Sequence, residues 1–140
     1  MVYVKDDGVF DAPIDRIWKY LNDTEGRHSH DAYQITGVRE QKGNVLVVNA
    51  KTKRPEGGFD NEVWKFVFDP PFGSEFEVLE GPAKGTKHTH TYIPMGNKTK
   101  VIVTGDFHLA GYDDATTKKL TLQTLENVFK QDNSNLKTYK

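Results

Sequence analysis

Apolar and polar residues alternate with a period of two through the middle of the chain, between Tyr33 and Leu109. Separators rich in Gly, Pro and Asn divide this region into short apolar runs at regular intervals, which predicts six strands joined by tight turns. The predicted strands cover residues 33–38, 44–50, 61–68, 74–80, 88–93 and 100–109. Residues 2–10 are rich in β-branched and aromatic side chains and predict one more strand at the start of the chain.

Helical spacing of apolar residues replaces this alternation on both sides of the six strands. Residues 12–23 predict an amphipathic helix with Pro13 in its first turn, and residues 23–32 can form a second short helix. After Gly111 neither Gly nor Pro interrupts the chain, so a long terminal helix is predicted with Asp113 as its cap. Its inner stripe consists of Leu122, Leu125, Phe129, Asp132 and Leu136.

The order of these elements predicts an α+β fold in a single domain that spans residues 1–140. A seven-stranded antiparallel sheet with one apolar face must be covered, and a terminal helix of about seven turns is the natural cover. No internal repeat or linker divides the chain. A curved sheet that wraps around one helix leaves space between the two, and that space is the candidate ligand site.

Composition and charge narrow the classes of function. The formal net charge is −1, with 19 basic and 20 acidic residues, and no basic cluster points to nucleic acid. The chain has no cysteine, which excludes disulfides, thiolate metal sites and a cysteine nucleophile. No apolar run approaches the roughly 20 residues that span a bilayer, so we expect a cytoplasmic protein without integral membrane association.

Three stretches of the sequence resemble a known superfamily. They are "FDAPIDRIWKYLND" at residues 10–23, "DPPFGSEFEVLEGPAKGTKHTHTYIP" at residues 69–94 and "KTKVIVTGDFHLAG" at residues 98–111. Together they look like the helix-grip superfamily of START lipid-transfer domains, polyketide cyclases and aromatases, plant pathogenesis-related allergens and coenzyme Q-binding proteins. The resemblance implies a helix-grip fold with a deep, mostly apolar cavity, on a scaffold that serves carriers, receptors and enzymes alike.

The stretch "KHTHTYIP" places His88, His90 and Tyr92 two residues apart on one predicted strand. Alternation sends all three side chains to the same face, and Lys87 to the other. Relatives of this texture commonly carry apolar or aromatic residues at the two histidine positions, so the resemblance implies a cavity more polar than is usual. If the register were shifted by one residue, the three rings would face solvent instead.

We expect this protein to bind a small hydrophobic or amphipathic molecule between the sheet and the terminal helix. Burial of the apolar part would supply affinity, while His88, His90 and Tyr92 would select the polar end. The predicted ligand-binding residues are Trp18, Trp64, Phe66, Phe76, His88, His90, Tyr92, Leu122, Leu125 and Phe129. We expect no cofactor, no nucleic acid partner, and a monomer or weak dimer.

Two other functions remain open from the sequence. In a cyclase- or hydrolase-like enzyme, His88 or His90 would act as general acid or base, and Tyr92 would donate a hydrogen bond to a ligand oxygen. In a partner-binding module the interior would be filled by side chains instead. The plainest interpretation of the two histidines is structural, with Thr89, Thr91 or backbone groups as their hydrogen-bond partners.

We also expect no bound metal. Two imidazoles at positions i and i+2 of a strand can reach one zinc or copper ion, but such a site needs at least a third ligand. The candidates for it are His28, His30, Asp106 and His108, and the sequence fixes none of them.

Overall fold

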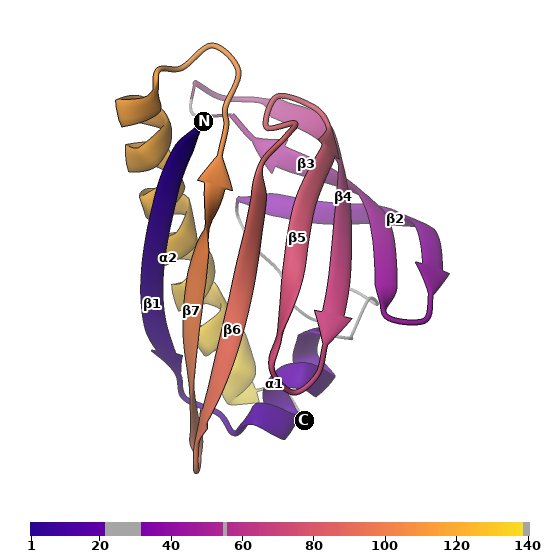
Figure 1. Cartoon of the computed structure of the whole chain (residues 1–140), viewed down its shortest axis with the longest axis vertical. Helices are drawn as coiled ribbons and strands as arrows, with labels where there is room; N and C mark the ends of the chain where they lie inside the picture. Colours follow the sequence, from indigo (N-terminus) through magenta and orange to yellow (C-terminus); the bar gives the residue numbers. More distant parts are fainter. Residues whose placement is uncertain (22–31, 55, 139–140) are drawn as a thin grey trace.

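The computed structural model describes residues 1–21, 32–54 and 56–138 of the chain. It contains one seven-stranded antiparallel sheet in the order β1-β7-β6-β5-β4-β3-β2, with a long helix lying across one of its faces (Figure 1). The strands are β1 (Val2–Phe10), β2 (Tyr33–Lys42), β3 (Val45–Lys53), β4 (Phe59–Asp69), β5 (Gly73–Glu80), β6 (Lys87–Met95) and β7 (Lys98–Phe107). The helices are α1 (Ile14–Leu21) and α2 (Asp114–Thr138).

This architecture confirms the predicted fold class, because all seven strands and the long terminal helix form in the predicted parts of the chain. The first predicted helix is α1, while the second, over residues 23–32, lies outside the described residues apart from Ala32. Within the described part of the chain no helix is long and apolar enough to cross a membrane.

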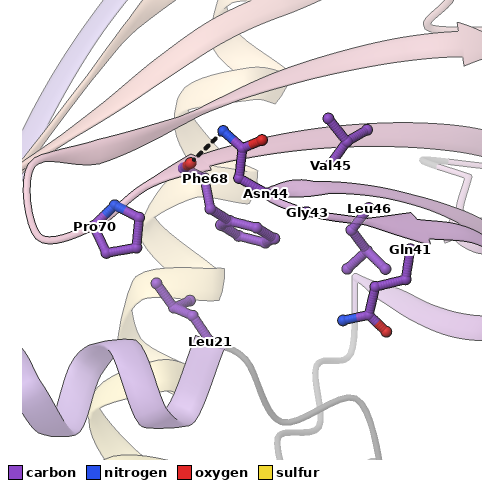
Figure 2. A pocket seen from close by; sticks show the side chains of 8 residues that line it. All are labelled: Leu21, Gln41, Gly43, Asn44, Val45, Leu46, Phe68 and Pro70. Carbon is purple, nitrogen blue, oxygen red and sulfur yellow. Dashed lines mark hydrogen bonds between the residues drawn. The ribbon is translucent and has the colours of Figure 1, made fainter.

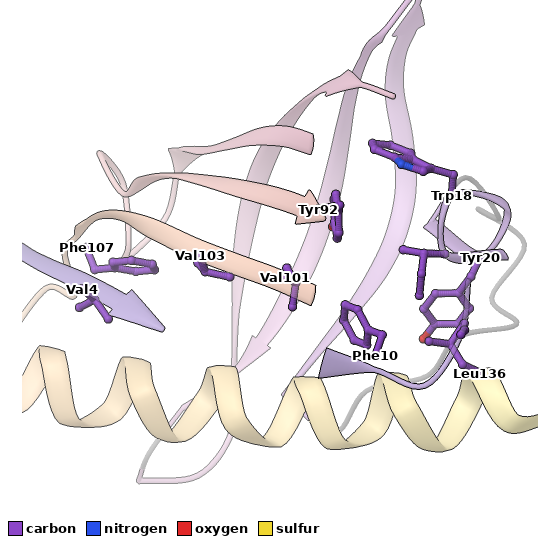
Figure 3. Close-up of a cluster of buried hydrophobic side chains, with 11 residues drawn as sticks. Val4, Phe10, Trp18, Tyr20, Tyr92, Val101, Val103, Phe107 and Leu136 are labelled. Atoms are coloured by element: carbon purple, nitrogen blue, oxygen red, sulfur yellow. The ribbon is translucent and has the colours of Figure 1, made fainter. Parts of the chain in front are cut away.

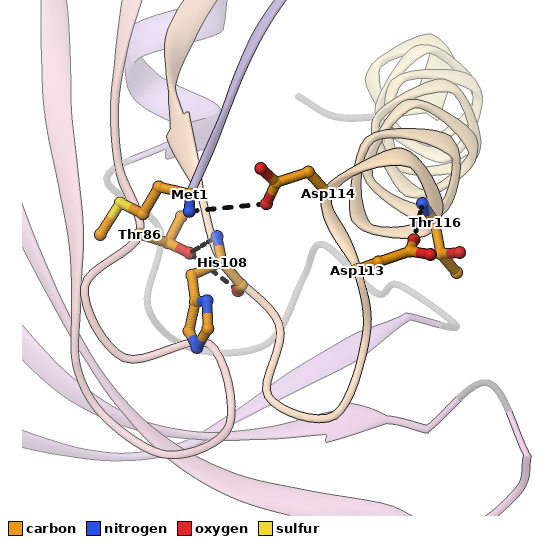
Figure 4. A network of polar contacts seen from close by, with 6 residues as sticks. All are labelled: Met1, Thr86, His108, Asp113, Asp114 and Thr116. Carbon is orange, nitrogen blue, oxygen red and sulfur yellow. Dashed lines mark hydrogen bonds and ion pairs between the residues drawn. The ribbon is translucent and has the colours of Figure 1, made fainter.

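Both helices begin with the hydrogen bonds that their sequences predict. Pro13 has no N–H to lose at the start of α1, and its carbonyl accepts bonds from the backbone N–H groups of Arg16 and Ile17. At the start of α2, Asp113 Oδ1 accepts a hydrogen bond of 2.7 Å from the Thr116 N–H (Figure 4). Asp113 is therefore the cap of the terminal helix, as predicted.

Helix α2 lies against the half of the sheet that contains β1 and β7. The backbone and the helix approach closely at Gly8, where a Cβ atom would lie 2.7 Å from ring carbons of Phe129. The Phe129 ring also packs on Phe10, with centroids 4.8 Å apart. Glycine at position 8 thus leaves the space into which the helix inserts its largest side chain.

The interior consists of two apolar clusters on the same face of the sheet. The helix-side cluster contains Val4, Phe10, Ala12, Ile17, Trp18, Tyr20, Tyr92, Val101, Val103, Phe107 and Leu136 (Figure 3). The sheet-side cluster contains Leu46, Val48, Ala50, Trp64 and Val78, with Tyr33, Ile35, Phe66, Phe68, Phe76 and Ala83 packed against it. Phe68 packs against both clusters and lies at their boundary.

Candidate ligand-binding site

Strand β6 presents His88, His90 and Tyr92 to the inner face of the sheet. His88 and Tyr92 are buried and His90 is partly buried, whereas Lys87 and the two intervening threonines are exposed. The predicted orientation of the three rings is thus confirmed, and a register shifted by one residue is wrong. Thr89 and Thr91 point away from the imidazoles, so they do not serve as the hydrogen-bond partners that the structural interpretation of the histidines requires.

The ring of His88 lies in a stack that joins the two apolar clusters. It is nearly parallel to Phe76 of β5 and to Phe107 of β7, with centroid distances of 4.5 and 5.1 Å, and His90 stacks beside it at 4.9 Å. Gly105 of β7 is the residue paired with His88, and a Cβ atom there would lie 2.5 Å from His88 Cα and Cβ. The stack therefore depends on the absence of a side chain at position 105.

Two nitrogen atoms of this imidazole pair are buried without a hydrogen bond. His88 Nδ1 and His90 Nε2 are inaccessible to solvent and have no partner among the residues that the structure describes. His90 Nδ1 lies 3.3 Å from the Tyr92 hydroxyl, so one side of that ring is satisfied. A buried polar group without a partner costs roughly 1–3 kcal/mol, which makes both nitrogens candidate hydrogen-bonding positions for a ligand.

Burial keeps these groups uncharged at neutral pH. It lowers the pKa of His90 to about 4, although Asp132 acts in the opposite direction. Burial, with a smaller contribution from His90, also holds the pKa of His88 well below its usual range. The pKa of Tyr92 is raised by burial and then by Asp132, while a hydrogen bond with Ser74 lowers it. The inner face of β6 therefore offers neutral hydrogen-bonding groups rather than charges.

The two buried indoles contribute only apolar surface, because each N–H group already has a partner. Trp64 Nε1 donates to a carboxylate oxygen of Glu62 at 3.0 Å, and Trp18 Nε1 donates to the carbonyl of Pro71 at 3.2 Å. The other carboxylate oxygen of Glu62 accepts from the Ala83 N–H. The candidate polar recognition groups on β6 are the histidines and Tyr92.

A second polar group faces the interior from the helices and was not predicted from the sequence. The Tyr20 hydroxyl donates to Asp132 Oδ1 at 2.6 Å and accepts from Asn135 Nδ2 at 3.1 Å. This network ties α1 to α2, and the negative charge of Asp132 acts on His90 and Tyr92 across the inner space. The sequence shows Asp132 on the inner stripe of the terminal helix, and a charged residue at such a position is the signal that could have identified it.

A pocket of about 260 Å³ lies at the end of α1, next to the turns that follow β2 and β4 (Figure 2). It is lined by Leu21, Gln41, Gly43, Asn44, Val45, Leu46, Phe68 and Pro70. None of the ten predicted ligand-binding residues is among them. Gln41 and Asn44 supply polar groups at its rim, although the Asn44 amide already donates to the Phe68 carbonyl at 3.0 Å.

The strand register shows how far this pocket lies from the imidazoles. Phe68 of β4 is paired with Ser74 of β5, and Ser74 is paired with His90 of β6. Paired residues share a face and neighbouring strands are about 4.8 Å apart, so the Phe68 wall of the pocket lies roughly 10 Å from His90. The small side chain between them on the sheet, Ser74, is buried, and the Trp18 ring packs on both Phe68 and Tyr92, with centroids 6.0 and 5.5 Å apart.

The structure divides the predicted ligand-binding residues between the two clusters. Trp64, Phe66 and Phe76 belong to the sheet-side cluster. Trp18 and Tyr92 belong to the helix-side cluster, and Leu122, Leu125 and Phe129 pack against it. His88 and His90 lie at the junction through their ring stack. Their participation in binding stays a prediction, and the structure adds Ser74, Phe68 and Asp132 to the candidates.

The described residues contain no group of three or more His, Cys, Asp or Glu side chains that could hold a metal ion. Asp106 and His108 are exposed. The backbone of His108 exchanges hydrogen bonds with the Thr86 hydroxyl. Nearby, the amino group of Met1 lies 3.5 Å from Asp114 Oδ1 (Figure 4). His28 and His30 lie outside the described residues.

Comparisons with known proteins support the fold. No protein-family model matches the chain, and no curated protein matches it. Among solved structures, the chain is similar to TTHA0849 from Thermus thermophilus, with 18% identity over 96% of each chain and a TM-score of 0.79. The Zhui aromatase/cyclase from Streptomyces sp. R1128 shares 17% identity over 96% of this chain and 90% of that one, with a TM-score of 0.69. A START superfamily protein from Mycobacterium smegmatis shares 15% identity over 99% of each chain, with a TM-score of 0.74.

The chain has a START-like helix-grip fold. This confirms the resemblance that the sequence showed, at the level of fold. At identities of 15–18% the likeness extends to the arrangement of strands and helices and not to the residues of a site. The START-like fold hosts proteins of different activity, so the function has to be argued from the inner face of this chain.

Proposed function

We propose that this START-like protein binds a small hydrophobic or amphipathic molecule on the inner face of its sheet. The observation that supports this proposal most directly is the pair of buried imidazole nitrogens without partners, surrounded by apolar rings. A structural histidine is normally satisfied by its own protein. Two adjacent unsatisfied ones are better explained by a ligand that completes their hydrogen bonds.

The position of the pocket fits the same function. A molecule that occupies the pocket beside Phe68 and moves the Trp18 ring aside would reach His90 after roughly 10 Å, a distance that a two-ring compound spans. The pocket volume of about 260 Å³ limits the ligand to modest size, close to the lower end of common ligand sites. A cytoplasmic location, a single domain over residues 1–140, a monomer or weak dimer and the absence of a cofactor complete the proposal.

Fluorescence titration with N-phenyl-1-naphthylamine, an uncharged apolar probe, tests the binding function. We expect saturable binding of one probe per chain, and loss of that binding in Ser74→Leu, because the larger side chain fills the space between Phe68 and His90 that the probe would occupy. Glu75→Leu is the matched control, since it adds the same side chain at the next position of β5, on the exposed face. If the probe does not bind, or if both variants bind it as the wild type does, the proposed site is wrong.

An enzyme of the cyclase type is the second candidate, and the contact between His90 and Tyr92 is the observation that favours it. With a pKa of about 4 the His90 imidazole is a weak base at neutral pH, which argues against general acid–base catalysis by this residue. Neutral His90 and Tyr92 could still polarise a carbonyl through hydrogen bonds. Mass spectrometry would then show conversion of a co-purified molecule over time, abolished in His90→Phe while the molecule still binds.

A further inference from the structure

Taking the binding function proposed above as given, we propose that the bound molecule is uncharged. It carries a hydroxyl or carbonyl oxygen that hydrogen-bonds to His88 Nδ1, His90 Nε2 or both. The geometry of the site supports this ligand class first. Both nitrogens are inaccessible to solvent, and the aromatic rings of Phe76 and Phe107 stack on His88, beside which His90 lies. A ligand whose polar group lies next to these nitrogens is shielded from water, so that group must form its hydrogen bonds with the imidazoles.

The pKa shifts of His90 and Tyr92 show which charges are disfavoured at this position. One is a base and the other an acid, and they contact each other at 3.3 Å. The pKa of the imidazole is lowered and the pKa of the phenol is raised, with burial as the largest cause in both. The site therefore disfavours a positive charge on one group and a negative charge on its neighbour. A ligand ammonium or carboxylate placed here would meet the same desolvation penalty.

Asp132 of α2 is the charged group that affects the pKa values of both His90 and Tyr92. Its negative charge raises the pKa of His90 and of Tyr92, so it opposes an anionic ligand directly. It would favour a cation, but the desolvation of His90 outweighs it, because the resulting pKa still falls to about 4. The Asp132 carboxylate is also engaged by the Tyr20 hydroxyl at 2.6 Å. The balance at the imidazoles thus favours neither sign of charge.

A neutral imidazole has one N–H donor and one lone pair, which fixes what the ligand must offer. If His90 Nδ1 accepts from the Tyr92 hydroxyl, Nε2 carries the proton and donates to a ligand oxygen. If Nδ1 donates, Nε2 accepts from a ligand hydroxyl. A carbonyl serves the first arrangement and a hydroxyl serves either, so both groups belong to the proposed class, while a hydrocarbon leaves both nitrogens unsatisfied.

Four naphthalene derivatives that differ only in their polar group test this proposal. They are naphthalene, 2-naphthol, 2-naphthoate and 2-naphthylmethylammonium, each measured at pH 7 by displacement of N-phenyl-1-naphthylamine from the whole protein. We expect 2-naphthol to bind about tenfold or more tightly than each of the other three, since it alone satisfies a buried nitrogen without carrying charge. The advantage of 2-naphthol over naphthalene should disappear in His90→Phe, in His88→Phe or in both, according to which nitrogen binds the oxygen. It should persist in His108→Gln, which alters an exposed histidine.

The outcomes separate this proposal from the binding function on which it rests. If 2-naphthoate or 2-naphthylmethylammonium binds as tightly as 2-naphthol, the charge assignment is wrong and the binding function stands. Equal affinity for naphthalene and 2-naphthol means that the nitrogens do not contact the ligand. If the probe binds but none of the four displaces it, this proposal fails and the binding function stands. If the probe itself does not bind, both proposals fail.

A measurement on the wild-type protein avoids any folding defect of the variant. In a ¹⁵N-detected NMR experiment on the histidine side chains, 2-naphthol should shift the Nε2 resonance of His90 or the Nδ1 resonance of His88. Naphthalene should leave these resonances in place. An equal response to both compounds, or no response at saturating 2-naphthol, would contradict the proposed hydrogen bonds.

Discussion

The two apolar clusters of the inner face differ in what covers them. Helix α2 lies over the helix-side cluster, where Val4 and Leu136 are almost completely inaccessible. In the sheet-side cluster the rings of Trp64, Phe66 and Phe76 mainly contact one another edge to face, with centroids 5.2–6.4 Å apart, and Phe66 and Phe76 stay partly exposed. Val48 and Ala50 of the sheet-side cluster are as inaccessible as Val4 and Leu136, so the difference lies in the partly exposed rings of Phe66 and Phe76. Under the proposed function these rings would adapt to a ligand, while the helix-side cluster stabilises the fold.

Truncation of Leu136 in the helix-side cluster should lower the stability of the protein more than any other change considered for the two clusters. Its side chain is 2% exposed, so Leu136→Ala leaves a cavity under α2 and should lower the free energy of unfolding by about 2–5 kcal/mol. Denaturant unfolding followed by circular dichroism measures this loss. Leu122→Ala, on the same helix but only partly buried, should lose clearly less, and an equal loss in both would contradict a core centred on Leu136.

Addition of a methyl group at Gly8 should disturb the same cluster from the opposite side. In Gly8→Ala the new Cβ would lie 2.7 Å from the Phe129 ring, and we expect a loss of about 1–3 kcal/mol through overpacking. The double variant Gly8→Ala/Phe129→Leu should recover part of this loss, because the smaller side chain vacates the space. A double-mutant cycle in denaturant measures the coupling, and simple additivity would mean that the two residues do not compete for space.

Acidification should act on the junction of the two clusters. The pKa values of His88 and His90 are lowered in the folded state, to about 4 for His90, so the unfolded chain binds more protons between about pH 6.5 and pH 4. Stability is therefore full above pH 6.5 and falls with pH through this window. The slope is up to about 1.4 kcal/mol per pH unit for each histidine.

The midpoint of thermal unfolding, recorded between pH 7 and pH 4, checks this dependence. His90→Phe should reduce the decline because it removes one of the two groups, whereas His108→Gln should leave it unchanged. A decline of the same steepness in His90→Phe and the wild type would show that other groups carry it.

Substitution of Phe66 should have the smallest effect on stability. Phe66→Leu removes part of a partly exposed ring that packs against the sheet-side cluster, and we expect a loss of about 1 kcal/mol or less. The same change enlarges the space near the imidazoles, so affinity for bulky apolar probes should rise or stay equal. A loss as large as that of Leu136→Ala would remove the proposed distinction between the clusters.

The sequence predicted the fold well because strand alternation and turn chemistry are local signals. The register of Trp64 with Val78 and of Phe66 with Phe76 puts the aromatic faces inward as the alternation of β4 and β5 requires. The same alternation placed His88, His90 and Tyr92 correctly, since β6 pairs with β7 without a register shift. The cap at Asp113 followed from residue type and position alone.

The details of the site could not be predicted, because they depend on which strands become neighbours. The stack of His88 between Phe76 and Phe107 requires β6 to pair with both β5 and β7, and it requires Gly105 at the matching position. The pocket is lined partly by turn residues such as Gly43 and Asn44, whose sequence indicates only a turn. The bond between Tyr20 and Asp132 joins positions 112 residues apart, beyond the reach of any local pattern.

The close approach at Gly105 also limits how this interior can be remodelled. Any side chain introduced there would collide with the β6 backbone, so β7 offers no adjustable position opposite His88. To fit a larger or differently shaped ligand, protein engineers would have to substitute residues of β4 and β5, namely Phe66, Phe68, Ser74 and Phe76. Among proteins that share this glycine but bind different ligands, we expect the sequence differences to be concentrated at those four positions.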